Sequence, residues 1–188
     1  MVNGVLYVIA DCSAGFKEDG KAALQRNLLI SLMSASRRLE YQQHDIIYIG
    51  WNNELFESGQ VSPEYDIDLS FNGKLNVALL KDIVAEAGEN GRFLLLSDGL
   101  FADDDMAYLK EIKELAGQLK SVIAVVSVGA DADDGLLADI SVPERKCFRA
   151  VDILTAFHEL CKKSYYNEPN TDSLGGKKVI RNARRSFL

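Results

Sequence analysis

The chain has 188 residues, 47% of them hydrophobic and 26% charged, which is typical of a single globular domain with a buried core. Its net charge of −7 argues against nucleic acid as a partner, and no apolar run approaches the roughly 20 residues that span a bilayer. The three cysteines form no CxxC pair and the N-terminus has no evident secretory signal, so we expect free thiols and a cytoplasmic protein.

Strand-like and helix-like hydrophobic patterns alternate along the chain. Short apolar runs predict strands, and apolar residues three and four apart predict helices. In chain order these patterns predict a strand over 5–10, a helix over 21–39, a strand over 46–51, a short returning edge strand over 54–57, a helix over 75–84, a strand over 93–97, a helix over 106–115, a strand over 122–128 and a helix over 151–161. The alternation predicts an α/β fold, with a doubly wound, mainly parallel six-stranded sheet and helices on both faces.

The composition changes near residue 164. Residues 164–188 contain few apolar side chains and carry a net charge of +3, whereas residues 1–163 carry −10. A polar segment without an apolar stripe does not build a core of its own. We therefore expect one domain over 1–163 and a mobile basic tail over 164–188, which could contact the acidic body, an acidic partner or nothing.

Oxygen-bearing side chains follow two of the predicted strands. Asp11 and Ser13 come after the first strand, and Asp98 comes after the strand over 93–97. Because the carboxyl ends of parallel strands share one edge of a sheet, we expect these side chains to face one another there. Their oxygens suit a hard cation such as Mg²⁺, although Asp and Ser also commonly stabilise turns. We expect both aspartates at the surface, where substitution shifts stability by under about 1 kcal/mol.

Five short segments occur in a recognisable order. They are 11–15 (Asp-Cys-Ser-Ala-Gly), 72–79 (Asn-Gly-Lys-Leu-Asn-Val-Ala-Leu), 97–99 (Ser-Asp-Gly), 128–131 (Val-Gly-Ala-Asp) and 148–152 (Phe-Arg-Ala-Val-Asp). In this order they resemble the von Willebrand factor A domain, over roughly residues 4 to 163. The resemblance implies a Rossmann-like fold and a metal-ion-dependent adhesion site with Asp11, Ser13 and Asp98 as ligands.

Two ligands of that family are replaced in this sequence. Gly15 stands where the family has its second Ser, and Gly73 stands where it has a Thr. Lys74 follows directly and could place a positive charge beside the site, in competition with a cation. With two of five oxygen ligands lost, we expect a degenerate site that binds Mg²⁺ weakly or not at all.

Acidic residues gather beyond the carboxyl ends of two predicted strands, at 103–105 and at 131–134. We expect them to form an acidic rim that contacts a partner through Asp103, Asp131 and the neighbouring Lys74. Each cluster also has a structural interpretation. The first can stabilise the start of the following helix, and the second can be a solvated loop.

The resemblance implies a non-catalytic role. We expect a bacterial, cytoplasmic module that binds a protein partner through the strand-end face, similar to tellurite-resistance-associated A-domain proteins, which are encoded with kinases, phosphatases or ATPases. The alternative is a Mg²⁺-dependent phosphotransferase or phosphatase with Asp11 as nucleophile, although Ser13 replaces the second Asp that such enzymes need. A purely structural domain is a further alternative. The sequence has no nucleotide-binding glycine loop and no base near Cys12, so we expect no enzymatic activity and a buried Cys12.

Overall fold

The computed structural model describes residues 5–38, 45–57, 69–144 and 146–162. Along these ranges helices and strands alternate, and three short 3₁₀ helices follow strands or precede helices. The elements are β1 (Leu6–Asp11), η1 (Ala14–Lys17), α1 (Lys21–Ser36), β2 (Ile46–Trp51), β3 (Leu55–Glu57), α2 (Val77–Ala87), β4 (Arg92–Ser97), η2 (Asp103–Asp105), α3 (Met106–Gln118), β5 (Val122–Ser127), α4 (Asp134–Ile140), β6 (Cys147–Arg149), η3 (Ala150–Asp152) and α5 (Ile153–Lys162). The predicted tail over 164–188 lies outside the described residues.

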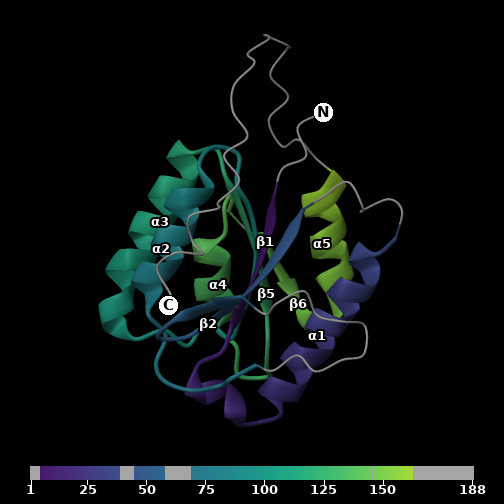
Figure 1. Cartoon of the computed structure of the whole chain (residues 1–188). Helices are drawn as coiled ribbons and strands as arrows, with labels where there is room; N and C mark the ends of the chain where they lie inside the picture. Colours follow the sequence, from purple (N-terminus) through teal and green to yellow (C-terminus); the bar gives the residue numbers. More distant parts are fainter. Residues whose placement is uncertain (1–4, 39–44, 58–68, 145, 163–188) are drawn as a thin grey trace, which may run out of the picture.

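The strands form one six-stranded sheet in the order β3-β2-β1-β4-β5-β6. Every neighbouring pair is parallel except β2 and β3, which are antiparallel (Figure 1). The prediction of a mainly parallel six-stranded sheet is therefore confirmed, and so is the return strand after the turn at Asn52 and Asn53. The four longer predicted strands are adjacent in the sheet, as the sequence indicated.

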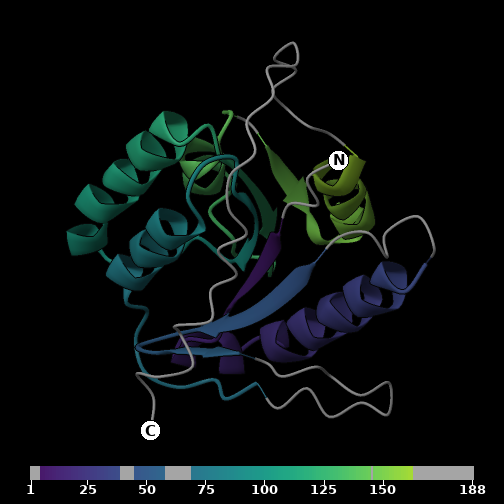
Figure 2. The same ribbon diagram turned by 45° about the horizontal axis from the view of Figure 1, so that its top comes forward.

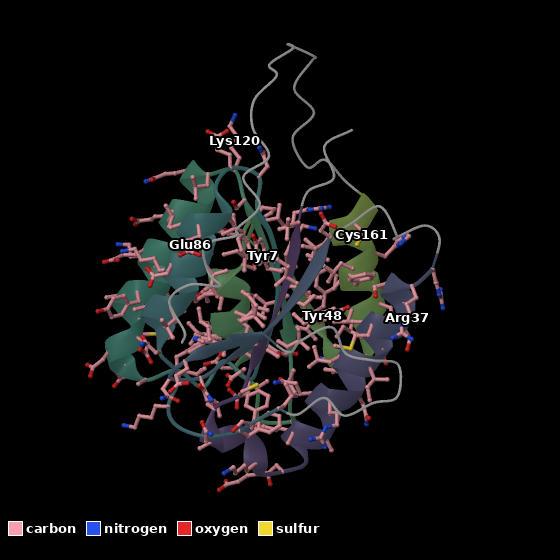
Figure 3. All side chains as sticks on the ribbon, in the orientation of Figure 1. Tyr7, Arg37, Tyr48, Glu86, Lys120 and Cys161 are labelled. Carbon is pink, nitrogen blue, oxygen red and sulfur yellow. The ribbon has the colours of Figure 1, made fainter. Side chains whose placement is uncertain are left out.

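Helices cover both faces of the sheet. Helices α1 and α5 lie on one face, and α2, α3 and α4 lie on the other (Figures 1 and 2). Alternate strand residues enter different cores, so Val8 packs toward α1 and α5 while Tyr7 packs toward α2 and α3. Figure 3 shows this division, with Tyr7 on one side of β1 and Tyr48 and Cys161 on the other. Because both faces are covered, β1 and β5 are buried along their whole length and are apolar up to their last residues.

One helix was absent from the sequence prediction. Residues 134–140 form α4, whereas the sequence suggested a solvated acidic loop that includes Asp131 and Asp133. The helix has only seven residues and buries only Leu137 and Ile140, so its apolar stripe is too short for a periodic pattern. None of the helices within the described ranges is long and apolar enough to cross a membrane.

The fold brings several loops to one edge of the sheet. The carboxyl ends of β1, β4 and β5 lie at the lower edge in Figure 1, where η1 and the first turn of α1 also lie. Backbone hydrogen bonds join these loops, from Val128 N to Ser97 O at 3.0 Å and from Asp133 N to Asp98 O at 2.8 Å. The candidate residues therefore stand on connected backbone rather than on independent loops.

Candidate functional site

Asp11 is the last residue of β1, and its side chain lies inside the protein. The residue is fully buried, and both carboxylate oxygens accept hydrogen bonds, Oδ1 from Ser13 N at 2.9 Å and Oδ2 from Ser97 Oγ at 3.0 Å. The Nε2 of Gln25 donates to the Asp11 backbone carbonyl. Burial raises the pKa of Asp11 from its ordinary value of 3.8 to about 7, since an ionised carboxylate loses its hydration there. Asp11 thus fastens the first strand end to β4 and α1.

Asp98, which follows β4, is held by a cation from within the chain. Its Oδ1 accepts a hydrogen bond from Leu100 N at 3.0 Å, and its Oδ2 accepts one from the Lys21 ammonium at 2.8 Å. The same ammonium lies 2.7 Å from Oδ2 of Asp131, after β5. Lys21 therefore bridges carboxylates from two neighbouring loops.

Lys21 is the first residue of α1, and its side chain is only 4% exposed. Burial alone would lower its pKa, but the hydrogen bonds with Asp131 and Asp98 outweigh this effect and raise the pKa above 10.5. The side chain is therefore an ammonium at neutral pH. A cation is unfavourable at a helix N-terminus, so the two carboxylates also offset the helix dipole. The Lys21 hydrogen bond in turn lowers the pKa of Asp131.

The structure corrects one expectation about this site and adds two residues to it. Asp11 and Asp98 were expected at the surface, but they are 0% and 5% exposed. Lys21 and Gln25 were missed, although both are buried and extend the apolar stripe of α1 back by two turns at i, i+4 spacing. In the sequence, this polar cluster was indicated by a lysine and a glutamine at positions of a predicted helix that face the core. Lys74 is exposed, and its predicted role beside the cation site stays a prediction.

The two replaced family positions differ in the space around them. Gly73 has a φ of +65°, and a Cβ on it would lie 2.6 Å from Oδ1 of Asn53, so a threonine does not fit there without rearrangement. A Cβ on Gly15 would meet only the Ser13 Oγ, at 4.0 Å, so a serine has room. A threonine at position 73 would therefore need a strained backbone and a movement of the Asn53 side chain, whereas a serine at position 15 would need neither.

The contacts of the carboxylates in the cluster of Asp11, Lys21, Asp98 and Asp131 indicate which kind of ion this site suits. Asp98 offers its Oδ2 to an ammonium at 2.8 Å, and no carboxylate in the cluster lacks a protein donor. A divalent cation at Asp98 would need about six oxygen ligands at about 2.0 to 2.6 Å, and the neighbouring ammonium would repel it. Within the described ranges, no group of three or more His, Cys, Asp and Glu side chains is placed to hold a metal ion. In this arrangement an ammonium lies between Asp98 and Asp131, and a divalent cation at the same place would face its like charge.

The acidic rim, residues 103–105 and 131–134, divides into capping and exposed side chains. Asp105 accepts a hydrogen bond from Ala102 N at 3.2 Å, and Asp133 accepts one from Leu136 N at 2.9 Å at the start of α4. Asp105 thus has the structural role that the sequence left open, whereas Asp133 caps a helix where the sequence suggested a solvated loop. Asp103 is exposed, and the side chain of Asp131 is 46% exposed although it pairs with Lys21. The exposed acids are available to a partner.

The cluster is poorly arranged for nucleophilic catalysis. Cys12 is fully buried, and burial raises the pKa of its thiol to about 12, which confirms the prediction of a core cysteine. Asp11 does not reach the surface, and both of its oxygens accept hydrogen bonds, so it is not placed to attack a substrate. Asp98, the residue that would hold Mg²⁺ in the phosphotransferase alternative, binds Lys21 instead.

Comparisons with known proteins identify the fold. No family model and no curated protein matches the sequence. Among solved structures, a von Willebrand factor type A protein from Catenulispora acidiphila superposes with a TM-score of 0.62 at 14% identity, over 85% of this chain and 42% of that chain. The manganese-loaded TRAP protein of Plasmodium vivax gives a TM-score of 0.64 at 13% identity, over 85% and 73%. The SpRpn10 VWA domain gives 0.58 at 11% identity, over 81% and 94%.

These likenesses show the fold. The chain has the von Willebrand factor A fold, which confirms the fold that the five sequence segments implied. It spans less than half of the Catenulispora acidiphila chain. Manganese is named in the description of the TRAP structure.

Proposed function

We propose that this chain is a protein-interaction module that binds a basic partner through the carboxyl edge of its sheet. The observation that carries the proposal is the exposed acidic rim. It surrounds the Lys21 cluster, whose net charge is also negative. In that cluster one ammonium is paired with two carboxylates, Asp98 and Asp131, which leaves one negative charge in excess. Exposed carboxylates nearby attract lysine and arginine side chains of a partner.

Apolar side chains beside the rim support a docking surface. Leu100 is 55% exposed directly after Asp98 and Gly99, and Met106 is 44% exposed at the start of α3. An interface commonly combines an apolar centre with a charged edge, and in the chain these two residues lie on either side of Asp103 and Asp104. The partner that fits this edge presents an apolar side chain flanked by basic ones.

The remaining parts of the proposal concern the setting of this interaction. A divalent cation is bound weakly or not at all, and catalysis plays no part. The three free cysteines suit the reducing cytoplasm. A kinase, phosphatase or ATPase encoded nearby, in a bacterium, is the class of partner that we propose to test first.

The proposal is tested by charge reversal on the rim. The partner is isolated with the wild-type chain by affinity purification and cross-linking, and its dissociation constant is then measured with purified proteins. Asp103→Lys with Asp104→Lys should weaken binding by tenfold or more, because exposed acids become like charges to the partner. Glu114→Lys, at the other end of α3, is the matched control and should change binding little. Equal binding by the rim variant and the control would place the interface elsewhere.

A further inference from the structure

The Lys21 ammonium lies where four segments of the chain meet. It extends from the first turn of α1 and contacts carboxylates after β4 and after β5, at 2.8 Å for Asp98 and 2.7 Å for Asp131. Its Nζ also lies 5.9 Å from the centre of the Phe16 ring in η1, within the range of a cation–π contact. A single positive charge therefore joins four segments at the carboxyl edge of the sheet.

The surrounding backbone is shaped to accept this side chain. A Cβ on Gly129 would lie 2.9 Å from Cε of Lys21 and 2.8 Å from Oδ1 of Asp131, and Gly129 has a φ of +110°. Any larger residue at position 129 would displace the lysine stem or the acid that binds it. The lysine is therefore packed into a fitted space between Gly129 and the Phe16 ring, rather than lying loosely over the two acids.

The contacts of Asp98 disfavour a second cation at the same oxygen. Its Oδ2 already accepts a hydrogen bond from the ammonium, and a divalent ion bound to it would lie within a few ångströms of a like charge in a buried setting. The threonine that could supply another oxygen is replaced here by Gly73, which has no side-chain oxygen. The ammonium and the missing oxygen act together against a metal.

We propose that the Lys21 ammonium is the resident cation of this site and replaces a divalent metal. In this arrangement the lysine supplies the positive charge that holds the loops after β4 and β5 against α1, and the edge stays assembled without metal. Its charge is covalently attached, so neither metal supply nor a chelator alters the site. The proposal concerns the site alone, and the docking function would stand even if this proposal failed.

The test measures Mn²⁺ binding by calorimetry and by the electron paramagnetic resonance signal of free Mn²⁺. Wild type should show no binding that depends on Asp98. Lys21→Met removes the charge while keeping the stem, so Asp98 and Asp131 become free to bind Mn²⁺ an order of magnitude or more tighter than wild type does. Asp98→Asn in the Lys21→Met background should abolish that gain.

Lys113→Met is the matched control. Lys113 pairs with Glu144 at 3.0 Å on the surface, and its loss should create no Mn²⁺ binding. The proposal is overturned if wild type binds Mn²⁺ in a manner that Asp98→Asn removes, or if folded Lys21→Met binds Mn²⁺ no better than wild type. If Lys21→Met does not fold, the titrations of wild type and of Asp98→Asn decide alone. A resident ammonium requires that these two proteins show the same Mn²⁺ titration, with no binding that is lost in Asp98→Asn.

Discussion

Removing the Lys21 charge should cost far more stability than removing a similar charge from the surface. In Lys21→Met, Asp98 remains with a side chain only 7% exposed and keeps Leu100 N as its donor. An uncompensated buried charge typically costs about 3 to 5 kcal/mol. Asp131 is 46% exposed, so water solvates it after the change and it adds little. We therefore expect a loss of about 3 kcal/mol, the lower end of that range.

Two further variants separate the buried charge from general damage. Lys21→Met with Asp98→Asn removes both charges and should recover about half of the lost stability, since neighbouring residues couple by roughly 0.5 to 3 kcal/mol. Lys81→Met breaks the surface ion pair between Lys81 and Glu111, whose side chains are 41% and 50% exposed. It should therefore shift the unfolding midpoint far less than Lys21→Met does.

Urea unfolding followed by tryptophan fluorescence measures these differences. The chain has one tryptophan, and Trp51 is fully buried at the end of β2, so its emission reports on the edge of the sheet that contains the site. A loss of about 3 kcal/mol shifts the midpoint by at least about 1 M urea, because slopes for small proteins are about 1 to 3 kcal/mol per molar. If Lys21→Met and Lys81→Met unfold at the same urea concentration, the buried ammonium does not hold the site together.

Three other properties follow from the same structure. Because burial raises the pKa of Asp11 to about 7, the folded state keeps a proton that the unfolded state releases above pH 4. The free energy of unfolding should therefore fall between pH 4 and 7, by at most about 1.4 kcal/mol per pH unit. Asp11→Asn should flatten this slope in urea titrations at a series of pH values. Cys147, which is partly exposed, should react with a thiol reagent before buried Cys12 does, as peptide mass mapping after brief alkylation would show; early labelling of Cys12 would contradict its burial. Gly73→Thr should lower the melting temperature more than Gly20→Thr, because both glycines have positive φ but only the first meets a neighbour within 4 Å; equal losses would remove the steric argument.

Hydrophobic patterning predicted most of the fold because the long elements carry clear periods. The strand over 122–128 is almost wholly apolar, and it proved to be β5, which pairs in parallel with both β4 and β6. Helix α4 was missed because seven residues with two buried side chains give no such pattern. Its start is set by the Asp133 side chain and by a backbone bond from Asp133 N to Asp98 O, a contact between distant parts of the chain.

The candidate site was predicted in position but not in its chemistry. The strand-end rule placed Asp11 and Asp98 at one edge correctly, because parallel strands fix that geometry. It did not reveal that Lys21, whose position on the buried stripe of α1 was visible in the sequence, would pair with Asp98 from 77 residues away. Spacing along a helix predicts which residues turn inward, but the partner of a buried charge depends on how helix and sheet pack together.

Anomalous diffraction from crystals grown in Mn²⁺ tests the resident ammonium most directly. The account predicts no anomalous peak between Asp11, Ser13 and Asp98, and a Lys21 Nζ within hydrogen-bonding distance of both Asp98 and Asp131, as here at 2.8 and 2.7 Å. A manganese peak coordinated by Asp98, with the Lys21 side chain turned away from it, would contradict the account.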